Sequence, residues 1–417
     1  MKIKAIETFL VTLPFRFSFG HSLATRAQST NLFVRVTLSD GTQGYGEGVP
    51  RDYVTGESAE ASQMLLEEQF APLLNGMDVS DVTAVIETLK HTFLDLGLDT
   101  HPRGAAWCAL ELAVLDATSK AHGRTVADCL GPIVQQRIRY GGVIPFGGKN
   151  ATLGMLLFYR AYGFKTVKVK VGKDLATDVA KVKLARKIMG EDAIVRVDAN
   201  CAWTVDQALQ AAEAFAPYRV ASYEQPVDPK DLAGMKKITA NVEAQVLADE
   251  SLCTIAQAEM LAREKICSAF NVRISKVGGL LAAQRMVDIA REHGIKCHLG
   301  AQVGESGILS AAARTFAVVN PRFENYEGSM NAFLLRKDLT AENLTVGPGG
   351  FGDLSYRCRQ EKGFRFSIGE GTLESWAQPA TPQASSSQTS SSQSVLEEAV
   401  IEEAPAINQE IFAGKPN

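Results

Sequence analysis

Five short apolar runs, each ending in a charged residue, recur at nearly constant spacing in the middle of this chain of 417 residues. The charged residues are Lys170, Asp198, Glu224, Asp249 and Lys276, and the intervals between them are 28, 26, 25 and 27 residues. A strand, a loop and a crossover helix together take about this length, so each interval predicts one βα unit. Parallel strands bring their carboxyl ends to one rim, where (β/α)-barrels carry out their chemistry. The five side chains are therefore expected to converge.

The repeat predicts an α/β fold, a TIM-like (β/α)7β barrel with an α+β capping domain before it. Beyond the five runs, strands are expected at 139–145, 295–299 and 322–326. Helices are expected at 174–189, 204–215, 228–239, 254–263, 280–293 and 306–319. No G-x-G-x-x-G motif follows a predicted strand, which disfavours the alternative of a doubly wound, dinucleotide-binding sheet.

Four segments are expected along the chain. They are a capping domain at 1–135, the catalytic barrel at 136–330, a return segment packing on the cap at 331–376 and a tail at 377–417. The tail is rich in Ser, Gln and Pro, cannot bury a core and is predicted to be disordered. Within the cap, strands are expected at 2–13, 31–38 and 43–48 and helices at 58–74, 80–94 and 104–122. The irregular stretches 14–30 and 49–56 are candidate lids over a site elsewhere, or ordinary surface loops.

Composition and charge argue against several other classes of protein. A net charge of −4 disfavours a nucleic-acid-binding role, which needs a basic face. The amino terminus has no long apolar run and nowhere do 18 apolar residues follow one another, so neither a secretory signal nor a membrane span is expected. The seven cysteines are dispersed without a Cys-x-x-Cys pair, which indicates reduced thiols in a cytoplasmic protein and disfavours zinc.

Three carboxylates on adjacent predicted strands, Asp198, Glu224 and Asp249, form a ligand set made only of oxygen. Such ligands suit Mg²⁺, with Mn²⁺ as an alternative, and do not suit zinc or copper. Each carboxylate could instead cap the helix that follows its strand. Their recurrence at three successive strand ends, flanked by lysines, favours the metal site.

Two lysines, Lys170 and Lys276, lie on the second and sixth predicted strands and would face each other across the barrel mouth. Burial and a nearby cation lower the pKa of an ammonium group, so such a lysine can accept a proton at neutral pH. Abstraction of a proton α to a carboxylate needs this arrangement, because the enediolate that forms must be neutralised as it appears. Lysines on opposite faces allow removal from one side and return from the other. For Lys170 the alternative is a structural salt bridge to Asp198 or Glu224.

Five short motifs at the predicted strand ends carry a resemblance to a known family. They are Lys168-Val-Lys170, Val197-Asp-Ala-Asn200, Tyr223-Glu-Gln-Pro226, Ala248-Asp-Glu-Ser251 and Ser275-Lys-Val-Gly-Gly279. Together they resemble the enolase superfamily and, with lysines on both the second and sixth strands, its muconate-lactonizing subgroup within the mandelate racemase/muconate lactonizing enzyme family. The resemblance covers roughly residues 3–370.

The resemblance implies roles for individual residues. It implies metal ligation by Asp198, Glu224 and Asp249, and acid/base roles for Lys170 and Lys276. Asn200 and Glu250 would stand behind these groups, with Glu250 next to Lys276. It also implies that the loops near 15–30 and 50–56 close over a small carboxylate substrate, and that the barrels form a homo-oligomer.

Specificity within the subgroup is expected to depend on the capping loops and the eighth strand. The N-terminal domain, with Thr55-Gly-Glu-Ser58, is similar to that of dipeptide epimerases, which carry an Asp-x-Asp pair where this chain has Asn325-Tyr-Glu327. The candidate substrate contacts are Lys168, Asn325, Glu327, Arg26 and Tyr53, with His21 and Arg51 as further candidates. Lys168 points to the same side as Lys170 and would hold the substrate carboxylate or lower the pKa of Lys170.

His298, on the seventh predicted strand, is expected to serve packing or substrate contact. The alternative is a catalytic base, as in the mandelate-racemase subgroup. That subgroup has an Asp on the sixth strand, where this chain has Lys276.

The sequence therefore predicts a cytoplasmic, Mg²⁺-dependent isomerase that abstracts the α-proton of a carboxylate through a metal-stabilised enediolate. The preferred reaction is racemisation or epimerisation of an amino-acid derivative, either a dipeptide or an N-acylamino acid. A muconate-type cycloisomerase and an o-succinylbenzoate-synthase-like dehydratase are alternatives that use one lysine as base and the other as an electrostatic stabiliser. A non-catalytic barrel that binds partners through its tail is the alternative of another class, and the complete set of rim groups argues against it.

Overall fold

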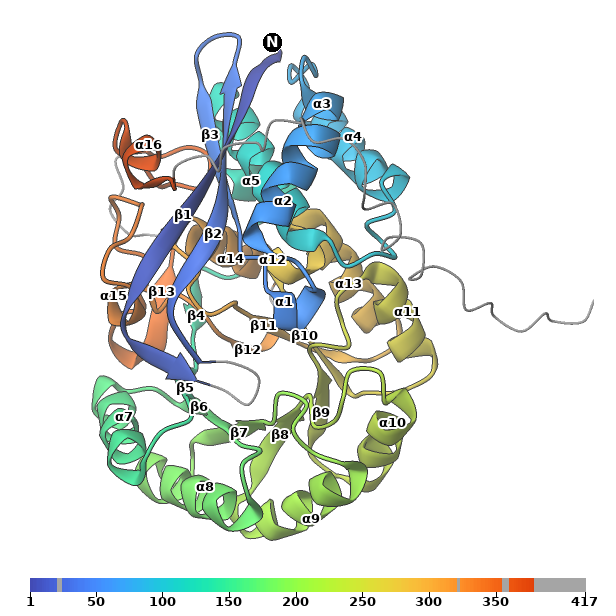
Figure 1. Ribbon diagram of the computed structural model, residues 1–417, viewed down its shortest axis with the longest axis vertical. Helices are drawn as coiled ribbons and strands as arrows, with labels where there is room; N and C mark the ends of the chain where they lie inside the picture. Colours follow the sequence, from blue (N-terminus) through green and yellow to red (C-terminus); the bar gives the residue numbers. More distant parts are fainter. Residues whose placement is uncertain (21–24, 321–322, 355–359, 379–417) are drawn as a thin grey trace, which may run out of the picture. The chain divides into compact units, whose positions relative to one another are not determined.

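Eight short strands lie side by side in one parallel sheet, in the order β12-β11-β10-β9-β8-β7-β6-β5 (Figure 1). They are β5 Gly142–Ile144, β6 Thr166–Lys170, β7 Ile194–Asp198, β8 Val220–Glu224, β9 Gln245–Ala248, β10 Ala269–Arg273, β11 Lys296–Gly300 and β12 Phe323–Tyr326. The sheet curls, because a parallel bridge joins Tyr140, just before β5, to Tyr326 at the end of β12. The predicted α/β barrel fold is confirmed.

The computed structural model describes residues 1–20, 25–320, 323–354 and 360–378. His21 and residues 379–417 of the predicted disordered tail lie outside the described residues. The first two residues of that predicted tail are ordered: Ala377 forms a bridge with Val11, and the Gln378 amide donates to the Leu10 carbonyl over 2.8 Å. Backbone pairing with β1 (Ile3–Gly20) therefore continues beyond the predicted boundary.

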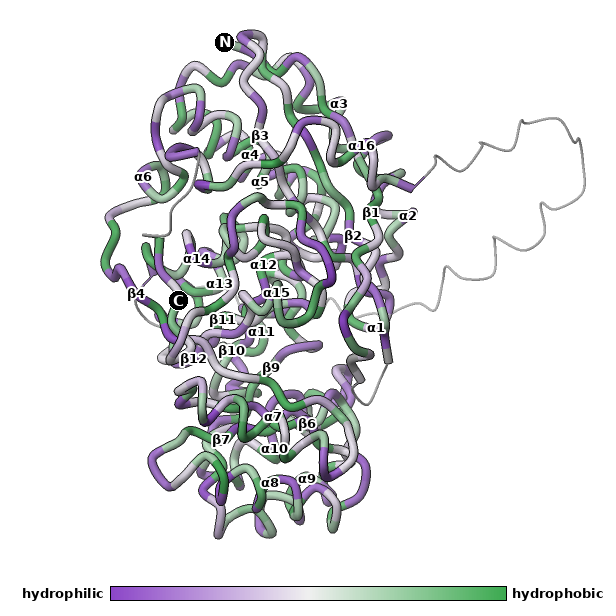
Figure 2. The backbone as a smooth tube through the Cα atoms, turned by 90° about the vertical axis from the view of Figure 1, so that its left-hand side faces the viewer, coloured by the Kyte–Doolittle hydropathy of each residue, from purple (hydrophilic) through white to green (hydrophobic). Residues whose placement is uncertain are grey.

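Amphipathic helices follow the strands and lie outside them. They are α7 Lys149–Tyr162, α8 Leu175–Met189, α9 Val205–Phe215, α10 Leu232–Asn241, α11 Ile255–Arg263, α13 Leu280–Glu292 and α14 Gly307–Val319. Figure 2 shows hydrophobic and hydrophilic positions alternating along most of them, as expected for helices with one buried face; α14 is the exception and is buried along almost its whole length. Capping boxes at Thr204 and Thr254 set the predicted starts of α9 and α11. Helix α10 begins later than predicted, because Asp231 caps it.

The cap consists of a three-stranded antiparallel sheet and a set of helices. The elements are β1, β2 Thr25–Leu38, β3 Gln43–Gly48, α1 Asp52–Thr55, α2 Ala59–Leu65, η1 Leu66–Phe70, α3 Ala71–Leu74, α4 Val82–Asp95 and α5 Gly104–Ala121. The prediction of an irregular stretch at 14–30 is wrong, because β1 continues to Gly20 and β2 begins at Thr25. The pairing register shifts between Pro14 and Phe19, and this irregularity removes the apolar alternation that indicates a strand.

The predicted first strand, 139–145, is divided between two sheets. Strand β4 (Arg137–Arg139) pairs antiparallel with β13 (Phe351–Asp353), and the barrel strand β5 begins only at Gly142. The chain changes partners between these strands, at Tyr140 and Gly141. The predicted run to Lys276 is also shorter: β10 ends at Arg273, and Lys276 lies in the helical turn α12 (Ile274–Val277).

Helix α5 packs on β3 through backbone-to-backbone contact. An added Cβ on Gly46 would lie 2.0 Å from the Ala109 carbonyl oxygen, and one on Gly48 would lie 2.0 Å from the Ala105 carbonyl oxygen. Only residues without a side chain allow a strand and a helix to approach this closely. The close approach fixes the position of α5, which contacts α12 next to Lys276.

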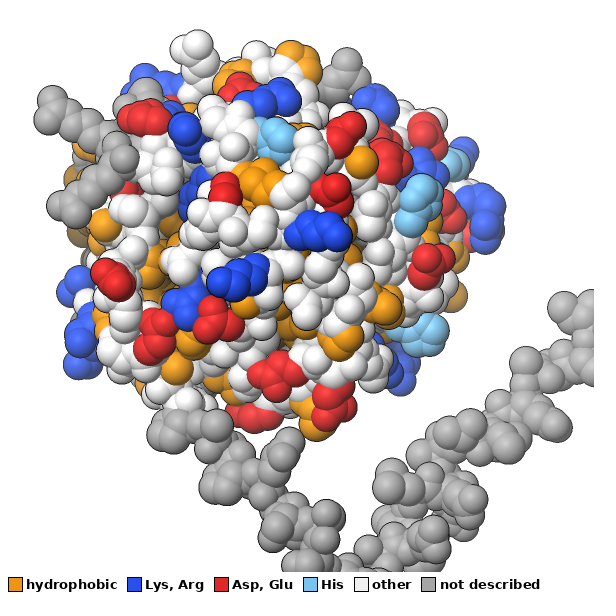
Figure 3. All heavy atoms as spheres, turned by 90° about the horizontal axis from the view of Figure 1, so that it is seen from above, with side chains coloured by type: hydrophobic (Ala, Val, Ile, Leu, Met, Phe, Trp, Pro, Cys, Tyr) orange, Lys and Arg blue, Asp and Glu red, His pale blue; other side chains and the backbone are white. Residues whose placement is uncertain are grey.

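Within the described ranges, every helix is too short or too polar to cross a lipid bilayer. On the face in Figure 3, acidic and basic side chains of described residues are interspersed rather than gathered into one area of a single sign.

Replacing Gly46 with alanine is expected to lower the free energy of unfolding by about 3 kcal/mol or more, because the new methyl group meets the backbone of α5. The matched control is Gly154→Ala in α7, where an added Cβ meets nothing within 4 Å. That change should raise stability by about 0.5–1 kcal/mol through helix propensity. Urea unfolding followed by circular dichroism measures both. Equal effects of the two substitutions would contradict the close packing of β3 on α5.

Candidate functional site

The carboxyl ends of four neighbouring strands are held in register at one rim of the barrel. Lys170 pairs with Asp198 across β6 and β7, and Asp198 pairs with Glu224 across β7 and β8. Asp249 follows β9 directly, and its amide donates to the Gln225 side-chain oxygen over 3.0 Å. The structure thus brings together the strand-end residues that the sequence singles out.

Lys170 is held by residues of the barrel. Its Nζ lies 2.6 Å from Asp198 Oδ2 and 2.5 Å from Asn200 Oδ1, and its carbonyl accepts from Lys181 Nζ over 2.8 Å. The side-chain nitrogen of Asn200 donates to Glu250 Oε1 over 3.0 Å. Glu250, which the sequence places behind Lys276, therefore connects to Lys170 through Asn200. The salt bridge to Asp198, which the sequence offers as the alternative role of Lys170, is present, and the Lys170 side chain still lies at the rim.

Lys276 lies in α12, where Gly278 and Gly279 at φ +96° and +104° turn the chain toward α13. Its Nζ donates to the carbonyl of Asp249 over 2.6 Å, to Asp249 Oδ1 over 2.7 Å and to the carbonyl of Asn271 over 3.1 Å. Burial lowers the pKa of Lys276 to about 7, in the direction expected from the sequence. This side chain can therefore exist without its proton near neutral pH.

Two further cations, Lys168 and Arg196, lie in a deeper layer of the barrel, two residues before the strand ends Lys170 and Asp198, and pair with carboxylates that include Glu224 of the rim. Lys168 Nζ lies 2.9 Å from Glu224 Oε1 and 2.7 Å from Glu327 Oε2. Arg196 joins the same two carboxylates, with Nη1 2.7 Å from Glu327 Oε1 and Nη2 3.1 Å from Glu224 Oε2. Glu327 is therefore paired with two cations, and Glu224, whose Oε1 also lies 3.5 Å from Arg273 Nη2, with three.

The pKa values of this layer follow from burial and pairing. Burial opposes the charge of Lys168, but Glu224, Glu327 and Asp198 outweigh it and raise its pKa above the ordinary value. Burial also acts to raise the pKa of Glu327, but Lys168 and Arg196 outweigh it and lower that pKa to about 2. Both groups therefore remain charged in the folded protein.

Sequence reasoning missed three polar residues inside the barrel. Arg196 belongs to the layer just described, Arg273 contacts Asp249 and donates to Gln302 Oε1 over 3.0 Å, and the Asn271 side chain donates to Glu224 Oε1 over 2.8 Å. The two-residue spacing of charged residues could have identified Arg196, which precedes Asp198 by two positions in an otherwise apolar strand. Side chains two apart share one face of a strand, so a charged residue there must point into the barrel.

Two candidate substrate contacts of the cap lie against each other. Arg26 Nη2 lies 3.0 Å from Asp52 Oδ1, and its guanidinium carbon lies 5.0 Å from the centre of the Tyr53 ring. Arg51, the further candidate beside them, is buried and donates to Ser29 Oγ and, over 2.7 Å, to the carbonyl of Val303. Arg51 thus joins the cap to the loop after β11.

His298 is buried inside the barrel between two amide side chains. Its Nε2 lies 2.9 Å from Gln245 Oε1, and its Nδ1 lies 3.5 Å from the side-chain nitrogen of Asn325. Burial, with Arg196 and Lys168 nearby, lowers the pKa of His298 well below its usual value. The geometry fits a neutral imidazole in a packing role and brings the candidate contact Asn325 next to it.

The rim offers hard oxygen donors that suit a divalent cation. Asp198, Glu224 and Asp249 are fully buried, and each is turned toward a lysine or arginine. In this arrangement no three His, Cys, Asp or Glu side chains among the described residues are grouped around one point. Glu250 Oε2 and Asn271 Oδ1 are buried oxygen atoms without a hydrogen-bond partner. Buried carboxylate and amide oxygen atoms are the kind of ligand that Mg²⁺ prefers, and here most of them already pair with cationic side chains.

Comparison with known proteins gives a family for both parts of the chain. Residues 5–131 match the family described as "Mandelate racemase / muconate lactonizing enzyme, N-terminal domain". Residues 155–352 match the family described as "Enolase C-terminal domain-like". The two matches include every rim residue and the two candidate lids.

Three similar proteins differ in the reactions for which they are named. Muconate cycloisomerase 1-1 of Acinetobacter lwoffii is 32% identical, over 88% of this chain and 96% of that protein. N-succinyl-L-Arg/Lys racemase of Bacillus cereus is 26% identical, over 90% of this chain and 97% of that protein. The crystal structure of a dipeptide epimerase from Enterococcus faecalis V583, complexed with Mg and the dipeptide L-Leu-L-Tyr, superposes with a TM-score of 0.79. It is 26% identical and covers 88% of this chain and 100% of that one.

The deeper ion pairs predict a specific loss of stability. Glu327→Gln keeps the side-chain volume but leaves Lys168 and Arg196 undercompensated, which should cost about 3–5 kcal/mol of unfolding free energy at pH 7. Glu324→Gln on the same strand is the control; its 3.0 Å pair with Lys296 is exposed, and its loss should cost less than about 0.5 kcal/mol.

The pH dependence of this effect has a definite sign. Because the pKa of Glu327 is lowered from 4.5 to about 2, its charge stabilises the fold above pH 4.5, and this contribution is lost as the pH falls toward 2. The difference in unfolding free energy between the wild type and Glu327→Gln should therefore narrow below about pH 4.5, measured by urea unfolding. A difference that is constant or widens on acidification would contradict the pairing.

Proposed function

Because this chain belongs to the mandelate racemase/muconate lactonizing enzyme family of the enolase superfamily, and is therefore a metal-dependent isomerase, we propose that it racemises an N-acylated amino acid by removing and returning its α-proton. One observation carries the proposal: Lys170 and Lys276 flank the rim carboxylates from opposite sides. Lys170 ends β6 and Lys276 lies in α12 directly after β10, and β7, β8 and β9 separate β6 from β10 in the sheet. A site with a base on each side can take a proton from one face of a carbon and return one to the other.

The two lysines exchange roles between the enantiomers. In one direction the Nζ of Lys276 takes the α-proton, the C–H electron pair moves into the carboxylate to give an enediolate, and Lys170 donates a proton to the opposite face. In the other direction Lys170 is the base and Lys276 is the acid. The pKa of about 7 of Lys276 matches a group that must be both base and acid at neutral pH.

Asp198, Glu224 and Asp249 are the residues that would hold Mg²⁺, and Mn²⁺ is the alternative to test against it. When bound, the cation supplies positive charge against the two negative oxygen atoms of the enediolate. The charged side chains of the site are otherwise balanced. The basic ones are Lys168, Lys170, Arg196, Arg273 and Lys276, and the acidic ones are Asp198, Glu224, Asp249, Glu250 and Glu327. Even with one of the two lysines deprotonated as the base, a divalent cation would leave these groups with an excess of positive charge, which favours a carboxylate substrate.

The state of Glu327 favours an N-acylated substrate over one with a free ammonium group. It is the one carboxylate at this position, where dipeptide epimerases carry an Asp-x-Asp pair, and Lys168 and Arg196 already occupy both of its oxygen atoms. An acylated nitrogen carries no charge and needs no such partner. Arg26, Tyr53 and Asn325 are the proposed contacts with the rest of the substrate. The similarity to an N-succinyl-L-Arg/Lys racemase supports this choice, and the similarity to a dipeptide epimerase makes dipeptides the second class to test.

Deuterium uptake tests the reaction and the substrate class together. N-succinyl and other N-acylamino acids, dipeptides and muconate would be incubated separately with the protein and Mg²⁺ in D₂O, and products analysed by chiral chromatography and mass spectrometry. We expect one deuterium at the α-carbon, with inversion, in the N-acylamino acids. In Lys170→Ala and Lys276→Ala the deuterated, inverted product should fall at least about 100-fold, because each removes one acid/base group.

Lys183→Ala, at an exposed position of α8, is the control and should retain full activity. Inversion in the dipeptides alone would move the substrate to that class. Lactone formation from muconate, or loss of water from a hydroxylated substrate, without deuterated inverted product would contradict the racemase in favour of a cycloisomerase or dehydratase.

Metal removal gives a separate test with a readout that does not depend on turnover. Treatment with EDTA should abolish activity, and Mg²⁺ should restore it and raise the melting temperature of the wild-type protein. Asp249→Asn should weaken Mg²⁺ binding, measured by titration calorimetry. Loss of a residue that only hydrogen-bonds to a metal ligand typically lowers metal affinity by about 10- to 100-fold, and loss of the ligand itself should cost more. Glu259→Gln, at an exposed position of α11, should bind Mg²⁺ like the wild type. Unchanged binding by Asp249→Asn would contradict the ligand set.

A further inference from the structure

The turn that carries Lys276 is held by the cap on its amino-terminal side. Ser275, the preceding residue, accepts a hydrogen bond at Oγ from the Val49 amide over 2.7 Å, and both residues are buried. Gly104, the first residue of α5, packs against the Lys276 backbone: an added Cβ would lie 2.5 Å from the Lys276 carbonyl oxygen and 2.7 Å from the Gly278 nitrogen. The cap thus touches the main chain of Lys276 directly.

The cap also holds the residues that follow Lys276. Helix α13 begins at Leu280 after Gly279, which has no side chain to cap it. Glu111 of α5 takes that place, with Oε1 accepting from the Leu280 amide over 2.6 Å and the Leu281 amide over 3.3 Å. Burial raises the pKa of Glu111 to about 8, so the group acts here as a hydrogen-bond acceptor for amide donors that otherwise lack partners at a helix amino terminus. Both flanks of Lys276 therefore depend on the cap.

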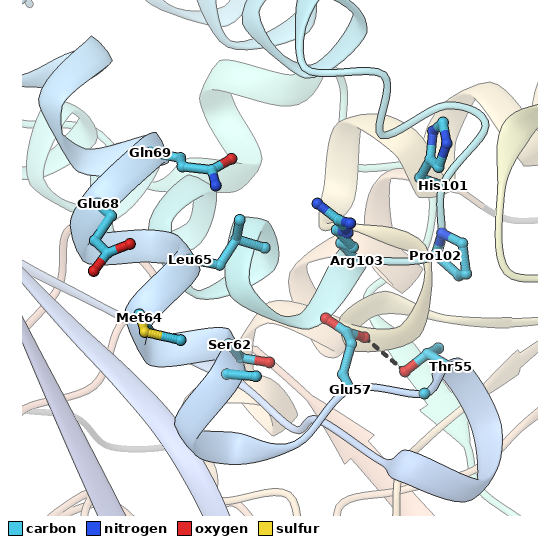
Figure 4. A pocket seen from close by; sticks show the side chains of 12 residues that line it. Thr55, Glu57, Ser62, Met64, Leu65, Glu68, Gln69, His101, Pro102 and Arg103 are labelled. Atoms are coloured by element: carbon cyan, nitrogen blue, oxygen red, sulfur yellow. Dashed lines mark hydrogen bonds between the residues drawn. The ribbon is translucent and has the colours of Figure 1, made fainter. Parts of the chain in front are cut away.

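The segment 49–57 of the cap is attached to this region at both of its ends. Val49 binds Ser275, as described, and at the other end Glu57 Oε1 accepts from the Ala105 amide over 3.0 Å, one residue after Gly104. Glu57 Oε2 accepts from Thr55 Oγ1 over 2.6 Å, and the pair borders a pocket of about 460 Å³ beside the start of α5 (Figure 4). The candidate lid is thus fixed to α5 and α12, next to one of the two lysines.

Lys170 has no comparable connection among the contacts described for it. Its side chain binds Asp198 and Asn200, and its carbonyl binds Lys181, all of them barrel residues. The cap reaches this group only indirectly: Lys181 Nζ lies 4.9 Å from the centre of the Phe146 ring, and the Phe146 amide donates to the Gly20 carbonyl of β1 over 3.0 Å. The two lysines are therefore supported by different parts of the chain.

From this asymmetry we infer that the cap positions Lys276 directly, with Ser275 and Glu111 as positioning residues, whereas Lys170 is positioned by the barrel. The inference rests on the proposed two-lysine reaction. The cap segment 49–57 and the proton transfer through Lys276 are then coupled, whereas proton transfer through Lys170 is set by the barrel. Changes at the contact between the cap and α12 should slow proton exchange for one enantiomer of the substrate and spare the other.

Exchange into recovered substrate separates the two lysines. Each enantiomer of N-succinylarginine would be incubated alone in D₂O with the holoenzyme, and deuterium measured at the α-carbon of the unconverted enantiomer. Lys276→Ala identifies the enantiomer whose proton faces Lys276. For that enantiomer, Ser275→Ala and Glu111→Ala, which remove the hydroxyl and the carboxyl acceptor, should lower exchange about tenfold, since small displacements of a reacting group cost this much or more. For the other enantiomer, exchange should change less than about twofold.

The controls are matched in chemistry and burial. Ser306→Ala also removes a buried hydroxyl at the contact of cap and barrel, where Ser306 Oγ donates to Glu47 Oε2 over 2.6 Å. Glu47→Ala matches Glu111→Ala, because Glu47 accepts from the Ser306 and Leu309 amides at the start of α14. Neither lies beside Lys276, so neither should alter the ratio of exchange rates between the enantiomers.

A second measurement does not depend on the substrate. Hydrogen–deuterium exchange of the backbone should accelerate in peptides covering 272–281 of Ser275→Ala and stay unchanged in peptides covering 166–172. Two results would overturn the inference and leave the proposed reaction intact. One is an equal reduction of α-proton exchange in both enantiomers, and the other is a Ser275→Ala variant in which backbone exchange changes equally in peptides 272–281 and 166–172. No deuterium in either enantiomer with wild-type enzyme would overturn the proposed function, and the inference with it.

Discussion

The compensation of buried carboxylates is the constraint on which the barrel interior depends. Asp198, Glu224 and Asp249 have no exposed surface, and an isolated buried charge costs several kcal/mol, as an order of magnitude, unless it is paired. The barrel strands also supply the cations that pair with these carboxylates. Because residues two positions apart on a strand share a face, Lys168 and Lys170 of β6 both point into the barrel, as do Arg196 and Asp198 of β7, and the charged side chains form two layers.

The two layers have different roles: the deeper one supports the structure, and the one at the rim carries the proposed chemistry. In the deeper layer, Lys168 and Arg196 each bind both Glu224 and Glu327, which makes a framework with little freedom to rearrange. At the rim, Lys170 and Lys276 each bind a single carboxylate side chain, Asp198 or Asp249. A deep framework that holds the strand ends in place lets the rim lysines approach a ligand at fixed positions, as a site preorganised for proton transfer requires.

The barrel and its rim could be predicted from sequence because strand ends repeat along the chain, which is a local and periodic signal. The arms of β1 and β2 beyond Pro14 could not, because an irregular register hides their alternation. The helical turn around Lys276 was read as strand because the apolar run continues past Arg273. The contact of Val49 with Ser275 joins residues 226 positions apart, and no pattern in a single sequence indicates it. Long-range contacts between cap and barrel are therefore what the structure adds.

The most direct test of the account is a crystal structure of the protein with Mg²⁺ and N-succinyl-L-arginine bound. We expect one cation held by Asp198, Glu224 and Asp249, and the Nζ atoms of Lys170 and Lys276 on opposite faces of the substrate α-carbon. A cation bound by other residues, or both lysines on the same face of that carbon, would contradict two-sided proton transfer in this barrel.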